Sequence, residues 1–147
     1  MRRYSVQMNG ISVAAAKTLI RITAPATMVL LLLRAKITQS GSVTSTQARG
    51  TIQRASTAGT GTAETPEKLE SGDPVATFTA ITDLTAEPTL TGDPILDEGF
   101  NWLNGMLWVP APEERIWVPP SGIALLRLPT LGATMTVSAE IILGEVG

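Results

Sequence analysis

The chain has 147 residues and a formal net charge of −2, and it contains neither cysteine nor histidine. These absences exclude disulfide scaffolds, cysteine-based metal centres and every catalytic triad that depends on a histidine or a thiol. A single domain of this length buries about 70% of the surface that its unfolded chain exposes, so neither a disulfide nor a metal is needed to hold a core.

Charged residues are distributed unevenly along the sequence. Residues 1–63 contain eight Lys or Arg and no Asp or Glu, whereas residues 64–147 contain all thirteen acids and three bases. Such an asymmetry is either neutralised within the fold or presented to a partner, for example a neighbouring protomer. Because a Greek-key fold brings together strands that are distant in sequence, we expect most of the bases to face acids from the second half.

From Tyr4 to Val13, apolar and polar side chains alternate on both sides of Asn9-Gly10. An Asn-Gly pair flanked by such alternation is the strongest short-range signal for a β-hairpin. We therefore predict two strands joined at this dipeptide, with residues 1–5 as a short basic arm. The start of the chain lacks the apolar stretch of a secretory signal, and the longest apolar run, Met28 to Leu33, is too short to span a membrane. We expect a soluble, unprocessed protein.

A short strand is predicted at residues 19–22, and a long central strand at residues 27–38, where an apolar run gives way to period-two alternation. Residues 40–65 are rich in Ser, Thr, Gly and Ala. Within this segment, residues 49–55 are compatible with a solvated strand. Residues 56–65 contain too few apolar side chains to build core, which predicts a flexible loop.

Short strand candidates separated by Gly or Pro fill the rest of the chain. Two of them, residues 75–82 and 85–90, are set off by turn signals at Gly72-Asp73-Pro74 and Gly92-Asp93-Pro94. Five more are residues 100–103, 105–109, 115–118, 123–128 and 134–143. The last has apolar side chains at alternate positions, so it is expected to be buried on one face. The pattern predicts a single all-β domain over residues 1–147, an antiparallel β-sandwich with a jelly roll as the favoured topology.

Carboxylates are the remaining candidates for acid–base chemistry. Asp97 lies close to Trp102 in the sequence, and Glu113 lies between Trp108 and Trp117. Acids beside aromatic residues are typical of glycosidases, so a general acid at Asp97 or Glu113 is one alternative. Acids that follow prolines in predicted turns are also normally solvated. We therefore predict no catalytic residue, no metal site and no cofactor.

The three tryptophans all fall between residues 102 and 117. Tryptophan is common at protein interfaces and in sugar-binding platforms, and it is also ordinary core material. Alternation places at least one of them on a different face from the core aliphatic residues, without identifying which. In the basic first half only Tyr4 could stack on a base, and the overall balance is acidic, so nucleic-acid binding is not expected.

Four segments at the two ends and in the last third of the chain are informative about family. They are Arg2-Arg3-Tyr4-Ser5-Val6, residues 105–116 around Trp108-Val-Pro110-Ala-Pro112, residues 120–123, and the closing Gly144-Glu145-Val146-Gly147. Together they resemble small virion structural proteins of tailed bacteriophages, in particular head decoration (capsid cement) proteins. The Ser/Thr-rich middle of the chain has no part in this resemblance.

The resemblance implies a non-enzymatic, often trimeric module on the capsid exterior. Such a module would be assembled in the host cytoplasm, bind the lattice of the major capsid protein and stabilise the head. The predicted interface residues are Arg2, Arg3, Tyr4, Trp102, Trp108 and Trp117. Two alternatives remain: a phage tail or fibre component, and a carbohydrate-binding β-sandwich that uses a tryptophan as its platform. Neither nucleic acid nor a membrane is an expected partner.

Overall fold

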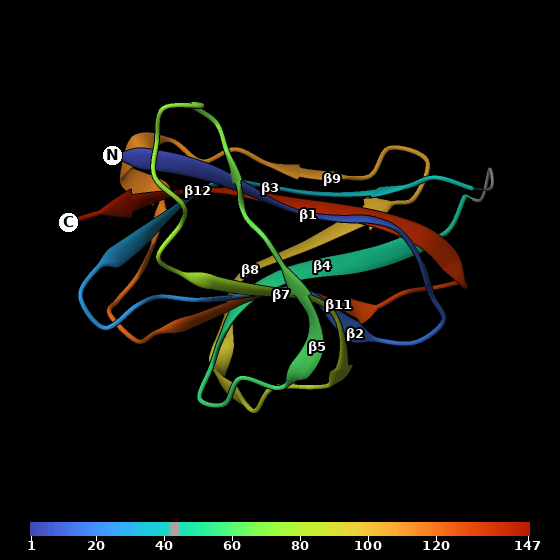
Figure 1. Ribbon diagram of the computed structural model, residues 1–147. Helices are drawn as coiled ribbons and strands as arrows, with labels where there is room; N and C mark the ends of the chain where they lie inside the picture. Colours follow the sequence, from blue (N-terminus) through green and yellow to red (C-terminus); the bar gives the residue numbers. More distant parts are fainter. Residues whose placement is uncertain (42–44) are drawn as a thin grey trace.

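The computed structural model describes residues 1–41 and 45–147 (Figure 1). Within these residues, two six-stranded antiparallel sheets pack together, which confirms the predicted all-β sandwich. Sheet A consists of β1 (Arg2–Val13), β3 (Val29–Gln39), β6 (Glu67–Lys68), β9 (Met106–Trp108), β10 (Ile116–Val118) and β12 (Met135–Val146). Sheet B consists of β2 (Lys17–Thr23), β4 (Gln47–Ala55), β5 (Thr60–Glu64), β7 (Thr79–Ala86), β8 (Leu90–Asn101) and β11 (Ile123–Thr130). One 3-10 turn, η1 (Pro112–Glu114), separates β9 from β10.

Strands from the two ends of the chain alternate within each sheet. The order in sheet A is β10-β3-β12-β1-β6, and β9 also pairs with β3. The order in sheet B is β5-β7-β2-β11-β4-β8. The late strand β12 therefore lies between β1 and β3, and the late strand β11 lies between β2 and β4. This arrangement places the acidic second half of the sequence beside the basic first half.

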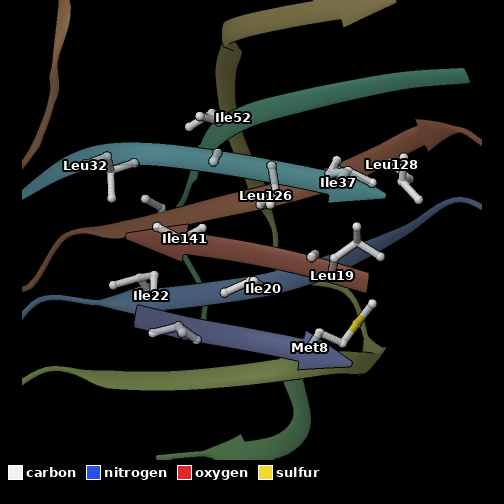
Figure 2. Packing of buried hydrophobic residues seen from close by; sticks show 14 of the residues in the cluster. Met8, Leu19, Ile20, Ile22, Leu32, Ile37, Ile52, Leu126, Leu128 and Ile141 are labelled. Atoms are coloured by element: carbon white, nitrogen blue, oxygen red, sulfur yellow. The ribbon is translucent and has the colours of Figure 1, made fainter. Parts of the chain in front are cut away.

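The hydrophobic core lies between the two sheets (Figure 2). Ile20 and Leu126 of sheet B and Ile37 and Ile141 of sheet A are each no more than 1% exposed. Along β12, buried and half-buried residues alternate from Met135 onward, as expected for a strand that is covered on one face. The period-two pattern of the sequence thus reflects the burial of alternate residues in this core.

Asn9-Gly10 is not a hairpin turn, contrary to the prediction. β1 runs through it as one strand, and its register with β12 shifts between Met8 and Ile11, which marks a β-bulge. Gly10 has a φ of 60°, the left-handed conformation that serves a bulge as well as a tight turn. The turn predicted at Gly92 is wrong for the same reason. Gly92 has a φ of 67° and lies in an irregular stretch inside β8.

Residues 1–5 do not form a free arm, which corrects a second expectation. Arg2 pairs with Glu145 and Arg3 with Gly144 at the start of the long β1–β12 ladder. Tyr4 is completely buried and packs edge-on against Phe78, with ring centroids 5.6 Å apart. The alternation seen from Tyr4 onward therefore belongs to a core strand that begins at Arg2.

The segment at residues 56–65 is also structured, in contrast to the predicted flexible loop. Residues Thr60–Glu64 form β5, which pairs with β7. The carbonyl oxygen of Ala58 accepts a hydrogen bond from Nη1 of Arg21 at 3.2 Å, on the outer face of sheet B. Because Arg21 is only 6% exposed, this segment covers part of that face. The segment makes this contact through its backbone, so its low content of apolar residues gave no indication of the contact.

The strand predicted at residues 85–90 is interrupted, because β7 ends at Ala86 and β8 begins at Leu90. The carboxylate of Glu87 accepts hydrogen bonds from the backbone N–H of Thr18, at 2.7 Å, and from its hydroxyl. These bonds tie the connection to β2.

Residues 42–44 of the Ser/Thr-rich segment, Val43 among them, lie outside the described residues. In the described ranges, no helix has the length and apolar character that a membrane crossing would require.

Candidate interaction surface

The six residues predicted to form an interface do not lie together. Tyr4 and Trp102 are in the core, at 0% and 1% exposure, and they cannot contact a partner. Trp108 is half-buried and packs against the core from β9. Trp117 on β10 is 51% exposed and is therefore the tryptophan that remains available for docking.

Trp102 is an anchor for the turn that follows β8. Its indole Nε1 donates a hydrogen bond to the carbonyl oxygen of Leu131 at 2.8 Å. Its ring packs edge-on against Phe100, with centroids 4.9 Å apart. A buried indole normally finds such an acceptor, so Trp102 has a structural explanation that requires no partner.

Trp117 is one of four exposed apolar side chains carried by β9, by β10 and by the residues just before and after β9, on the β3 side of sheet A. Its neighbours Ile116 and Val118 point into the core, so the indole is on the outer side. Leu103, Leu107 and Val109 are 50%, 59% and 63% exposed. We call Leu103, Leu107, Val109 and Trp117 the apolar edge. Large exposed apolar residues are candidates for contact with a partner, although single ones are ordinary.

The apolar edge is held in place by β3. Leu107 lies opposite Lys36 of β3, and Trp117 lies opposite Leu31 of the same strand. The connection between β9 and β10 contains two prolines and the η1 turn, which restrict its backbone. From sheet B, Nη2 of Arg54 donates to the carbonyl oxygen of Trp117 at 3.4 Å. β9 and β10, which carry Leu107 and Trp117, are thus fixed on β3.

Most of the basic first half is neutralised within the fold, as the interleaving of strands predicts. Among the described residues, five ion pairs join a base from residues 1–63 to an acid from residues 64–147. They are Arg2–Glu145 at 3.4 Å, Arg3–Glu70 at 2.9 Å, Arg49–Asp97 at 2.6 Å, Lys17–Asp83 and Arg34–Glu140. The charge asymmetry along the sequence therefore gives no separate argument for contacts between protomers.

Arg2 and Arg3, predicted as interface residues, have different surroundings. Arg3 and its partner Glu70 are exposed, so that pair is in water. Arg2 instead approaches Glu145, whose side chain is fully buried. Oε1 of Glu145 accepts hydrogen bonds from the backbone N–H and the hydroxyl of Thr77, at 2.6 and 2.7 Å. Nothing in the sequence indicated that Thr77 would cover this carboxylate.

This buried carboxylate fixes a connection that we call the strap, residues 69–78 between β6 and β7. The hydroxyl of Tyr4 donates to the carbonyl oxygen of Pro74 in the strap at 3.1 Å. Burial raises the pKa of the Tyr4 hydroxyl above its ordinary value, and the negative charge of Glu145 acts in the same direction. Tyr4 therefore stays protonated and acts as a donor that holds the strap.

The carboxylates considered as general acids lie at the surface. Asp97 accepts hydrogen bonds from Nε and Nη2 of Arg49, at 3.0 and 2.6 Å. These bonds and the charge of Arg49 lower the pKa of Asp97, whereas a general acid needs a raised one. Glu113 is exposed in η1. No group of three or more His, Cys, Asp or Glu in the described part of the chain is placed to hold a metal ion.

Comparison of the chain with protein-family models, with curated proteins and with solved structures gives no match.

Proposed function

We propose that this chain is a non-enzymatic capsid decoration protein that binds the major capsid protein lattice of a tailed phage and stabilises the head. The observation that carries the proposal is the apolar edge. Its four large apolar side chains are each half exposed or more, and one of them is a tryptophan, the residue most typical of binding hot spots. Such an edge is suited to a wide contact with another protein surface.

The rigidity of the scaffold also supports a docking role. β9 and β10 are paired with β3, and the two prolines between them limit the freedom that binding would otherwise remove. A surface that is already ordered loses little conformational entropy when it binds. The contact can therefore be strong through side-chain packing alone.

We infer that the sandwich is a jelly roll. Its support is the strand order β1-β12-β3 with β9 and β10 in sheet A, and β2-β11-β4-β8 in sheet B. When β9 and β10 are counted as one position beside β3, successive strands of this set alternate between the sheets except at β4 and β8, which are neighbours in sheet B, as expected for eight strands in two Greek keys. The strands β5, β6 and β7 then form an insertion between β4 and β8.

We further propose a homotrimer on the capsid exterior, assembled in the host cytoplasm. Closed rotational symmetry allows a chain to associate with itself without polymerising. Native mass spectrometry of the purified protein tests this stoichiometry. A monomer that stays monomeric on the particle would contradict the trimer and leave the docking proposal intact.

The docking proposal is tested by adding purified protein to undecorated heads of the phage that encodes it. Wild type should bind in saturable, symmetry-related copies and raise the resistance of the heads to heat. Trp117→Ala should weaken binding about tenfold or more, because it truncates the predicted hot spot. The matched control is Val75→Ala on the strap, which removes another exposed apolar side chain and should bind like wild type. Absence of head binding, or equal binding by both variants, would refute the proposal.

Two alternatives have direct tests of their own. An exposed indole such as Trp117 also suits stacking on a sugar ring, and glycan-array binding that is lost in Trp117→Ala would favour a carbohydrate module. A tail or fibre component would be found away from the head in electron micrographs of intact particles.

A further inference from the structure

Sheet B extends beyond sheet A on the side of β1. In sheet B, β7 and then β5 lie outside β2. In sheet A, the strand position beside β1 is taken by β6 alone, which pairs only with Tyr4 and Ser5. Among the described residues, no strand pairs with this side of β1 beyond Ser5. A strand position is therefore open next to the remainder of β1, on the side of the sandwich away from the apolar edge.

The backbone of β1 is oriented towards this open position. The carbonyl oxygen of Arg3 accepts a hydrogen bond from the backbone N–H of Leu69 in the strap, at 3.0 Å. Backbone groups of alternate residues in a strand point to the same side, so those of Gln7 and Asn9 face the same way as those of Arg3. Both residues line a hollow of about 250 Å³. The hollow thus has residues of the open edge of β1 along one wall.

The opposite wall of the hollow is polar and acidic. Thr62 and Glu64 come from β5, and Thr82 and Asp83 come from β7. Asp83 is paired with Lys17, whereas Glu64 has no cationic partner among the described residues. An occupant that offers both a peptide backbone and a positive charge would match the two walls.

We propose that an extended segment of a partner protein, carrying a Lys or Arg, adds to sheet A beside Gln7 and Asn9 of β1, with its basic side chain at Glu64. Main-chain hydrogen bonds provide affinity in this mode of recognition, and side-chain contacts provide specificity. The bulge after Met8 bends the strand, so the added segment pairs over only about four residues. The site is separate from the apolar edge and does not depend on capsid binding.

The test uses a blocked hexapeptide of alternating valine and threonine with one central lysine. Titrated into isotope-labelled full-length protein, it should shift the amide signals of Gln7 and Asn9 saturably and slow their hydrogen exchange. The control is the same peptide N-methylated at alternate residues, which retains the side chains and loses backbone donors, so it should not bind. No shift at these amides, or equal binding of the methylated peptide, would overturn the proposal.

Two variants locate the basic side chain. Glu64→Lys should weaken peptide binding about fivefold or more, because it replaces an attraction with a repulsion. Glu113→Lys makes the same charge change in the η1 turn and should leave binding unchanged. Trp117→Ala should also leave it unchanged, which separates this site from the proposed capsid contact. If Gln7 and Asn9 are already protected by self-association without peptide, the occupant is a second copy of the chain and the proposed partner is wrong.

Discussion

Replacing Trp102 by Phe should destabilise the fold much more than the same replacement at Trp117. Trp102→Phe removes the indole donor and leaves the carbonyl oxygen of Leu131 without its partner, which costs about 1 to 3 kcal/mol. The smaller ring also leaves a void of roughly 40 Å³, which adds about 1 kcal/mol at about 24 cal/mol per Å³. We therefore expect a loss of about 2 to 4 kcal/mol for Trp102→Phe. Trp117→Phe should change the free energy of unfolding by less than about 0.5 kcal/mol, because half of that indole is in solvent.

The assay is equilibrium unfolding in urea, followed by far-ultraviolet circular dichroism. A change of 1 kcal/mol corresponds to about 2 to 4 °C in a chain of this size, so Trp102→Phe should also lower the Tm by roughly 4 to 16 °C. The urea m-value should be the same in all three proteins, which shows that the comparison is of stability alone. Equal losses at the two positions, or a larger loss at Trp117, would refute the division into a core tryptophan and a surface tryptophan.

Two further predictions concern charged residues. Arg2→Ala leaves the buried carboxylate of Glu145 without its cation and should destabilise the fold by about 1 to 3 kcal/mol. Arg3→Ala removes one partner of an exposed pair and should cost less than about 1 kcal/mol. Urea unfolding of both variants measures the two losses, and equal losses would contradict the prediction. Asp97 has a lowered folded pKa, so its contribution to stability is present above the unfolded pKa of an aspartate and is lost as the pH falls through the folded value. Carboxyl NMR should show Asp97 titrating below an ordinary aspartate and returning to the ordinary range in Arg49→Ala; no difference between the two proteins would contradict the assignment.

Strand alternation was enough to predict the fold class. The pattern at residues 135–143 indicated a strand covered on one face, and β12 has that burial. Turn signals were less informative because Asn9-Gly10 and Gly92 adopt the left-handed backbone that both turns and bulges use. The sequence specified the local conformation at these glycines, and the pairing with β12 and β4 decided that the strands continue.

The candidate surface was predicted less completely than the fold. Alternation showed that Ile116 and Val118 share a face and that Trp117 lies on the other one, but it does not show whether a second layer covers that other face. Tyr4 and Trp102 were misplaced for this reason, because their burial depends on contacts with Phe78 and Leu131, which are remote in the sequence. The buried Glu145 was missed because its partners in the strap come from a segment with no strand pattern of its own.

The most direct test of the account is an electron cryomicroscopy map of undecorated phage heads to which the purified protein has been added. The account predicts symmetry-related density on the outer surface of the head, with Trp117 and the rest of the apolar edge buried against the major capsid protein. Heads without added density, or a bound protein whose apolar edge faces solvent, would contradict it.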